Sequence, residues 1–319
     1  MSAPAGPAVW NGLDQATLDA AYDQARWAPD MQEVLDTRRA ASAAALVRLG
    51  APRRLAYGPD PIERIDLYDP AGSGRPAPLL LFVHGGAWRS GCAAEYASIA
   101  EAFVRVGVRV ALPDFASVLD TGGDLRPLVG QVRRSIAWLQ REAPGLGIDA
   151  DAIVVCGHSS GAHLAAVALS GGAGAGGGAG SGGAAGPGET ALEAPRAALL
   201  VSGMYDLAPV RRSSRSQYVA FDDEVEERFS PMRHLERLRM PVTVSWGTRE
   251  SPEFVRQSRD FVRAIEARGQ PVRAIPLARD HFRILEEIER GDGVLFREIL
   301  RMLGRPVPTP GPRQEDGIA

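Results

Sequence analysis

Residues 153–169 read IVVCGHSSGAHLAAVAL, and this stretch decides the fold. The apolar run 153–156 is short and rich in β-branched residues, which predicts a buried strand. The G-x-S-x-G motif at 157–161 follows it, and the apolar segment 162–169 predicts a helix. A strand, a tight glycine turn and a helix in this order expose the Ser159 hydroxyl at the turn. The stretch therefore predicts an α/β unit with a candidate nucleophile at the end of a strand.

The same alternation of strands and helices continues on both sides of this motif. Short apolar runs predict buried strands at 79–83, 108–112, 153–156, 197–201, 242–246 and 272–277. Helical stretches lie between them at 95–106, 125–141, 162–169 and 252–268. Two half-exposed strands at 53–57 and 63–68 come first and resemble an antiparallel edge. We therefore expect an α/β fold with about eight mostly parallel strands flanked by helices.

The two ends of the chain differ from this repeating pattern. Residues 1–14 and 304–319 are expected to be loose, whereas 14–49 has the spacing of an N-terminal helical segment. The repetition shows no domain boundary, so we expect a single domain over 15–303. Within it, residues 170–189 are almost entirely Gly, Ala and Ser, which predicts a flexible insertion.

The glycine-rich insertion also matches a cofactor motif in a formal sense. Gly172, Gly174 and Gly177 have the spacing of a dinucleotide-binding fingerprint. That fingerprint must follow a strand and open a helix, because its amides bind phosphate at the helix N-terminus. Here it follows a helix and precedes a strand, so we expect no dinucleotide cofactor.

Composition and charge exclude several classes of function. The chain of 319 residues has a net charge of −3 and no lysine, so its 36 basic residues are all arginine. Lysine Schiff bases, Walker A loops and Ser-Lys dyads are therefore excluded. No arginine run resembles a nucleic-acid stripe, no apolar stretch reaches the length of a membrane span, and no signal pattern begins the chain. We expect a cytoplasmic protein with neither a nucleic-acid nor a membrane partner.

The two cysteines point to neither a disulfide framework nor a metal site. Cys92 and Cys156 are too few for the former and lack the ligand spacing of the latter. Cys156 ends an apolar run, as a small buried hydrophobic residue would. No metal is expected.

The loop His84-Gly85-Gly86-Ala87-Trp88 directly follows the predicted strand 79–83. Glycines allow backbone N–H groups to approach a carbonyl oxygen closely. We expect the amides of Gly86, Ala87 and Ser160 to form an oxyanion hole. An ordinary tight turn is the alternative interpretation.

A serine nucleophile needs a histidine base, and the chain offers five: His84, His158, His163, His234 and His281. The first three lie in the glycine loop, in the serine motif or at the start of the helix after it. His234 lies in a polar connection, whereas His281 follows the predicted strand 272–277. Because active-site groups of open α/β sheets lie beyond the carboxyl ends of strands, we expect His281 to be the base.

The acid that orients the histidine should lie between the serine and the histidine in chain order. Glu250 stands just after the predicted strand 242–246 and is the expected acid. Asp206, after the strand 197–201, and Glu253 are the alternatives. A carboxylate that only stabilises a helix N-terminus is the simpler interpretation of Glu250.

Five motifs follow one another along the chain: His84-Gly-Gly-x-Trp88, Gly157-His-Ser-x-Gly-Ala-His-Leu164, Ser202-Gly-Met-Tyr-Asp-Leu207, Gly247-x-x-Glu-Ser-Pro-Glu-Phe254 with Arg256-Gln257-Ser258, and Asp280-His-Phe282. In this order they resemble the α/β-hydrolase type of kynurenine formamidase over roughly residues 15–303. The first two motifs are also shared with many hormone-sensitive-lipase-like esterases. The resemblance implies a serine, histidine and acid triad, no metal, and hydrolysis of an N-formyl aryl amine.

Two features depart from that family pattern. The acid position is often aspartate, and here it is Glu250, whose longer arm loosens the geometric prediction. The insertion at 170–189 is also atypical. Trp88, Tyr205 and Phe282 adjoin the motifs, and either line an aromatic substrate pocket or belong to the core.

The expected function is hydrolysis of a small aromatic N-formyl amide, such as N-formylkynurenine, without a cofactor. A carboxylesterase with the same triad is the main alternative, and a non-catalytic binding module is another. The expected partner is a small-molecule amide or ester substrate, and a homodimer is left open.

Overall fold

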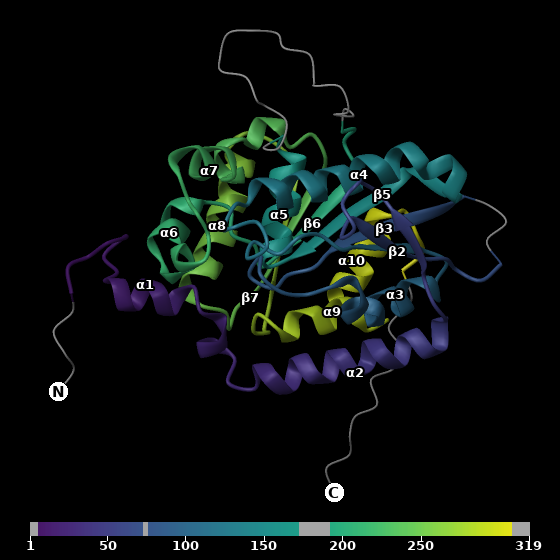
Figure 1. Cartoon of the computed structure of the whole chain (residues 1–319), viewed down its shortest axis with the longest axis horizontal. Helices are drawn as coiled ribbons and strands as arrows, with labels where there is room; N and C mark the ends of the chain where they lie inside the picture. The colour runs from purple at the N-terminus through teal and green to yellow at the C-terminus, as the bar shows by residue number, and fades with distance from the viewer. Residues whose placement is uncertain (1–5, 73–75, 172–191, 308–319) are drawn as a thin grey trace, which may run out of the picture.

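The computed structural model describes residues 6–72, 76–171 and 192–307, and its centre is an eight-stranded sheet (Figure 1). The strands are β1 (Arg53–Ala56), β2 (Arg64–Tyr68), β3 (Ala77–Val83), β4 (Arg109–Pro113), β5 (Ile148–His158), β6 (Ala197–Val201), β7 (Val242–Gly247) and β8 (Val272–Leu277). Their order is β1-β2-β4-β3-β5-β6-β7-β8. β1 and β2 run antiparallel to their neighbours, and all other pairs are parallel. The predicted fold class is confirmed.

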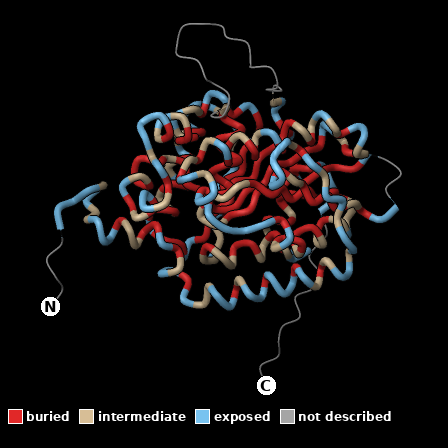
Figure 2. Tube along the Cα trace, in the orientation of Figure 1, coloured by how far each residue is buried: buried red, intermediate tan, exposed pale blue. Residues whose placement is uncertain are grey.

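Helices cover both faces of this sheet. They are α1 (Gln15–Ala21), α2 (Met31–Leu49), α3 (Ala97–Val104), α4 (Arg126–Leu146), α5 (Ser160–Leu169), α6 (Leu207–Arg212), α7 (Asp223–Arg228), α8 (Pro252–Ala267), α9 (Glu286–Glu289) and α10 (Val294–Met302). One core holds apolar side chains of α4, α5 and α8, and the other holds those of α3, α9 and α10. Figure 2 shows the strands between these layers as buried along most of their length.

The central strand β3 shows why both faces are covered. All seven of its residues are buried. Leu79 and Leu81 enter the core under α4 and α5, whereas Leu80 and Phe82 enter the core under α3 and α10. Successive side chains of a strand point to opposite faces, so a run of consecutive apolar residues requires helices on both.

Two predicted elements differ from the structure, and four helices were not predicted. The N-terminal helical pattern is broken into α1 and α2 by the 3-10 turn Gln24–Trp27. The strand β8 is at the sheet edge and only Ile275 of it is buried, because β7 is its sole neighbour in the described sheet. The helices α6, α7, α9 and α10 were not predicted. Apart from Ser170 and Gly171, the glycine-rich segment 170–189 lies outside the described residues.

In the part of the chain that the structure describes, every helix is too short or too polar to cross a bilayer.

Candidate active site

The residues predicted to carry chemistry gather at the carboxyl ends of β5, β7 and β8. Ser159 follows β5 and caps α5, Glu250 lies between β7 and α8, and His281 follows β8. Parallel strands end at the same edge of a sheet, which brings residues far apart in sequence together there. The relative exposure of each of the three residues is 5% or less.

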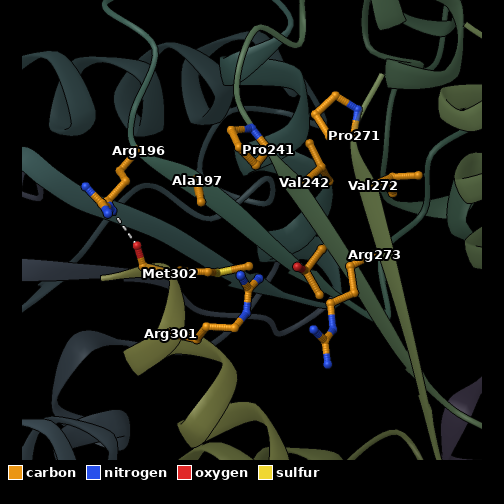
Figure 3. Close-up of a pocket in the computed structure, with 10 residues that line it drawn as sticks. Arg196, Ala197, Pro241, Val242, Pro271, Val272, Arg273, Arg301 and Met302 are labelled. Carbon is orange, nitrogen blue, oxygen red and sulfur yellow. Dashed lines mark hydrogen bonds between the residues drawn. The ribbon is translucent and has the colours of Figure 1, made fainter. Parts of the chain in front are cut away.

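The opposite edge of the sheet, where the parallel strands begin, carries a cavity instead of the predicted catalytic residues (Figure 3). A cavity of about 460 Å³ lies there beside Ala197, Val242 and Val272, which begin or nearly begin β6, β7 and β8. Arg273 and Arg301 also line it, and both form ion pairs with Glu298. None of the predicted catalytic residues lines this cavity. No group of three or more His, Cys, Asp or Glu residues suited to a metal ion occurs among the described residues.

The turn that carries Ser159 is strained and tightly packed. Its φ is +54°, a left-handed conformation that is uncommon for a residue with a side chain. A Cβ on Gly161 would lie 2.2 Å from the carbonyl oxygens of Val83 and His84, and one on Gly157 would lie 2.6 Å from the carbonyl oxygen of Gly161. Gly161 is therefore required for the turn to pack against the end of β3, and Gly157 for the turn to pack against the start of α5.

Backbone strain is concentrated at this edge of the sheet. The described residues other than glycine with a positive φ are Asn11, Ala87, Trp88, Ser159 and Ser202. All except Asn11 belong to loops around the candidate site. Such strain costs of order 1–3 kcal/mol per residue and persists where function or packing demands it.

One chain of hydrogen bonds joins the three predicted catalytic side chains. His281 Nε2 lies 2.8 Å from Ser159 Oγ, and His281 Nδ1 lies 3.1 Å from Glu250 Oε2. With Glu250 ionised, Nδ1–H donates to the carboxylate and Nε2 is left to accept from the serine hydroxyl. This is the tautomer in which the imidazole can remove the serine proton.

Glu250 is held by its second oxygen. Oε1 accepts hydrogen bonds from Ser202 Oγ at 2.5 Å and from the amide of Gly247 at 2.6 Å. Because Oε1 is bound in this way, Oε2 faces His281. Ser202 was not predicted to take part in the site. Its position directly after β6, as the first residue of the Ser-Gly-Met-Tyr-Asp-Leu motif, was the available signal.

The loop that carries His281 is held from two sides. His158 Nε2 lies 2.9 Å from the carbonyl oxygen of His281, and Arg38 Nη2 donates to the carbonyl oxygen of Phe282 at 2.8 Å. Burial lowers the pKa of His158 well below its usual value, so the ring stays neutral and donates through Nε2–H. Phe254 packs edge-on against the His281 ring with centroids 5.0 Å apart.

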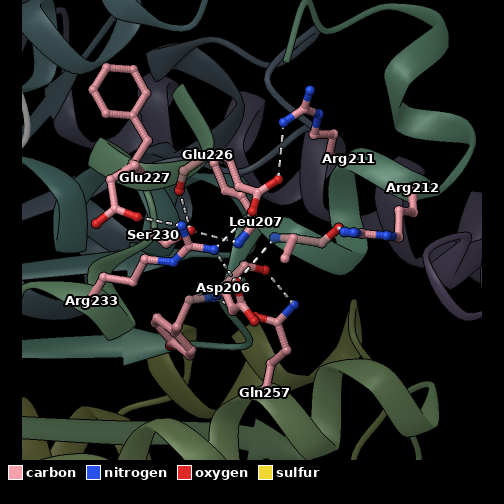
Figure 4. Close-up of polar contacts among 12 residues, drawn as sticks. Asp206, Leu207, Arg211, Arg212, Glu226, Glu227, Ser230, Arg233 and Gln257 are labelled. Carbon is pink, nitrogen blue, oxygen red and sulfur yellow. Dashed lines mark hydrogen bonds and ion pairs between the residues drawn. The ribbon is translucent and has the colours of Figure 1, made fainter. Parts of the chain in front are cut away.

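The alternative acids face other partners, and Figure 4 shows those of Asp206. Asp206 Oδ1 accepts from the amide of Ala208, which caps α6, and lies 3.7 Å from Arg233 Nη2. Glu253 pairs with Arg256 and accepts a hydrogen bond from Tyr22. Neither carboxylate is bonded to a histidine in the described structure.

The alternative base is also occupied elsewhere. His234 Nε2 lies 2.9 Å from the carbonyl oxygen of Glu227, in an exposed contact. Among the described residues His234 forms no hydrogen bond with Ser159, whereas His281 is hydrogen-bonded to the serine directly.

The predicted oxyanion loop presents free amides beside the serine. Gly86 and Ala87 have positive φ values of 121° and 55° and remain partly exposed. Among the hydrogen bonds of the described residues, neither amide acts as a donor. The amide of Ser160 is in the first turn of α5, where a helix leaves N–H groups unsatisfied. Trp88 N–H donates to Ser160 Oγ at 3.1 Å, which ties the loop to the helix.

The three aromatic residues considered for the substrate pocket fall into two groups. Trp88 and Tyr205 are 2% and 0% exposed, so both are core residues rather than walls of an open pocket. Tyr205 stacks on Phe261 with centroids 4.1 Å apart, and Trp88 Nε1 donates to His163. Phe282 alone keeps exposed surface, and its ring packs edge-on against His281.

Known proteins resemble this chain over most of its length. Kynurenine formamidases from Danio rerio and Salmo salar are 28% and 27% identical over 93% of the chain and 99% of their own lengths. The BD-FAE family model matches residues 65–174. The chain has the α/β-hydrolase fold and is similar to kynurenine formamidases and related esterases. This α/β-hydrolase acts on amides or esters.

Esterases are among the other relatives of this α/β-hydrolase. Esterase LipC of Mycobacterium tuberculosis is 29% identical over 76% of the chain and 59% of its own length. Among solved structures, a Silicibacter sp. protein proposed to be a thioesterase superimposes with a TM-score of 0.71 at 24% identity, covering 87% of the chain and 97% of its own. Thermogutta terrifontis esterase 2 gives 0.63 at 20% identity, with 82% and 98% covered. The solved structures show the shared fold.

Proposed function

We propose that this enzyme removes the formyl group from a small aromatic N-formyl amine such as N-formylkynurenine, with Ser159, His281 and Glu250 as its catalytic triad. The observation that carries the proposal is the unbroken hydrogen-bond chain from Ser159 Oγ through His281 to Glu250. Similarity to two kynurenine formamidases over nearly their whole length supports the choice of amide.

In the proposed mechanism, His281 Nε2 removes the Ser159 proton as Oγ attacks the formyl carbon. The amides of Gly86, Ala87 and Ser160 stabilise the negative oxygen of the tetrahedral intermediate. His281 then protonates the amine nitrogen as the C–N bond breaks, which leaves a formyl ester on Ser159. A water molecule deprotonated by His281 hydrolyses that ester, releases formate and restores the serine.

Glu250 has an indirect role in the proposal. A buried carboxylate on Nδ1–H fixes the tautomer of His281 and stabilises the imidazolium that forms. The two donors on Oε1 keep this carboxylate in place throughout the cycle.

A carboxylesterase is the second candidate function. The same triad cleaves an ester if the leaving group is an alcohol, and the similarity to Esterase LipC favours this reaction. In that case His281 protonates an alkoxide oxygen instead of an amine nitrogen.

The test is to measure kcat/KM for N-formylkynurenine and for short 4-nitrophenyl esters with the same preparation. We expect the formamide to be cleaved, and Ser159→Ala to abolish turnover of both kinds of substrate. Ser216→Ala, at an exposed serine, is the matched control and should retain full activity. Rapid ester cleavage with an untouched formamide would replace the proposed reaction with the esterase.

A further inference from the structure

Three arginines are buried among the described residues: Arg38, Arg109 and Arg215. Arg38 pairs with Glu289 at 2.9 Å, and Arg109 pairs with Asp69 at 2.7 Å. Arg215 is 7% exposed, yet no carboxylate of the described chain lies within 4 Å of it. Removing a charge from water costs several kcal/mol unless an opposite charge compensates it. Arg215 therefore lacks the partner that the other two buried arginines have.

The described hydrogen-bond partners of the Arg215 guanidinium are neutral groups. Nη1 donates to Tyr218 Oη at 2.8 Å, and Nη2 donates to the carbonyl oxygen of Tyr22 at 3.0 Å. Nε is buried and has no hydrogen-bond partner. The group lies 5.5 Å from the centre of the Trp88 ring. A guanidinium has five N–H donors in a fork that matches a carboxylate, and the described contacts use only some of them.

Arg215 has contacts that lead to the oxyanion loop on one side and to His281 on the other. On one side it lies over Trp88, the last residue of the oxyanion loop. On the other side it binds Tyr22, whose ring packs against Phe254 with centroids 5.9 Å apart. Phe254 in turn packs against His281. Arg215 is therefore linked to the oxyanion loop through Trp88, and to His281 through Tyr22 and Phe254.

A second cation reinforces the positive charge in this region. Arg89, next to Trp88 in sequence, lies 4.8 Å from the centre of the Tyr218 ring. Like Arg215, it has no carboxylate within 4 Å in the described part of the chain. Two arginines without an acidic partner beside the oxyanion loop favour an anionic ligand.

We propose that Arg215 binds a carboxylate of the substrate while the scissile formamide lies at Ser159. The inference rests on the proposed function and narrows its substrate class to N-formyl aryl amines that carry a carboxylic acid. A bidentate contact would use the Nε–H that has no partner now and would supply the missing opposite charge. It would also fix the distance between the recognised acid and the cleaved bond.

The experiment compares three formanilides that share one ring ketone. N-formylkynurenine carries a carboxylate and an ammonium group, 3-(2-formamidobenzoyl)propionate carries the carboxylate alone, and 2-formamidoacetophenone carries neither. We expect the wild-type kcat/KM to be about 10- to 100-fold higher for the two acids, as for a hydrogen-bonded charge pair. Arg215→Gln should remove this preference and leave the neutral substrate within about 3-fold of wild type.

Arg212→Gln is the matched control. It removes the same charge from the same connection, and Arg212 is exposed and donates to the carbonyl oxygen of Ala208. The control should keep the preference for acids. If Arg215→Gln lowers all three rates by one factor, Arg215 only anchors Tyr22 and Tyr218, and the proposal is wrong.

Product inhibition of the wild-type enzyme tests the proposal even if Arg215→Gln does not fold. Kynurenine and 2-aminoacetophenone are the matching products with and without the carboxylate. Stronger inhibition by kynurenine, by about 10-fold or more, supports the proposal, and equal inhibition overturns it. Failure to cleave any formanilide, with esters still cleaved, is a different result and overturns the proposed function instead.

Discussion

Two buried histidines flank the serine turn, and they have different partners. His281 faces Ser159 with one ring nitrogen and Glu250 with the other. His163, on α5, accepts a hydrogen bond from Trp88 Nε1 at 3.2 Å and lies 2.9 Å from the carbonyl oxygen of Phe229. Both rings are almost fully buried and hydrogen-bonded on both nitrogens. Only His281 has a carboxylate and a hydroxyl as its two partners.

The comparison shows that burial alone does not make a histidine a base. Burial lowers the pKa of His163 to about 4, and its neutral partners offer nothing that would stabilise an imidazolium. The ring is therefore a fixed neutral support beneath Trp88. In the proposed mechanism, the carboxylate of Glu250 stabilises the positive charge that forms on His281 when it takes the serine proton.

Removing the charge of Glu250 should leave His281, like His163, without a charged partner. Of the predictions made here, this substitution has the largest expected effect on kcat. Glu250→Gln keeps the shape but favours the wrong tautomer, so we expect kcat to fall by about 10³- to 10⁴-fold. His163→Gln should cost less than about 10-fold, because its ring only supports Trp88. Steady-state kinetics measure both, with thermal unfolding as the check on folding. A larger loss of kcat in Asp206→Asn than in Glu250→Gln would move the acid to Asp206.

Stability at acidic pH should report on His163. An unfolded histidine titrates near pH 6.5, whereas His163 in the folded protein titrates near 4. Between these pH values the unfolded chain binds more protons than the folded protein. The contribution of neutral His163 to the free energy of unfolding is therefore complete above about pH 6.5 and is lost as the pH falls toward 4. The loss is on the order of 3 kcal/mol. Denaturant unfolding at several pH values should show a shallower decline for His163→Gln, and an unchanged decline would contradict the assignment.

The Ser202 hydroxyl should contribute a smaller share of catalysis. Ser202→Ala removes one of the two donors to Glu250 Oε1 and leaves the Gly247 amide, so we expect kcat to fall about 10-fold with little change in KM. Ser245→Ala is the control, because Ser245 is equally buried and donates to the carbonyl oxygen of Ile275 instead. Equal losses of kcat in the two variants would show that Ser202 acts only through stability.

The smallest expected effect on activity is at Asp206, a carboxylate that is not bonded to a histidine among the described residues. Asp206→Ala removes the N-cap of α6 and should lower the free energy of unfolding by about 1 kcal/mol. We expect kcat to stay within about 2-fold of wild type, since no described contact links Asp206 to His281. Thermal unfolding and kinetics together measure this. A loss of activity without a loss of stability would contradict it.

The fold could be predicted because its strands are buried on both faces and therefore appear as uninterrupted apolar runs. The exposure of β8 could not be predicted, because the sequence does not state which strand lies at the edge. The helix α10 was missed although Leu295, Phe296 and Ile299 have helical spacing and are buried. That signal was available, and the other short helices, α6 and α7, are too short to show a clear period.

The candidate site was predicted from residues that lie shortly after the end of a strand. Chain order and strand ends favoured Ser159, Glu250 and His281, and the structure brings these three into contact. They left Asp206 and Glu253 open as alternative acids. Ser202 and Arg38 were missed because their roles depend on contacts between distant segments. Ser202 reaches across 48 positions in the chain, and Arg38 across 244.

The contacts of Arg38 with Phe282 and Glu289 also affect the order in which parts of the chain fold. The long helix α2 is synthesised early, but its arginine must wait for Phe282 and Glu289, which are 244 and 251 residues further along. Contacts that close such long loops form late, after local structure. We therefore expect a refolding chain to regain its helical signal before its loop after β8 is fixed, so that the protein looks folded for a time before it can turn over substrate.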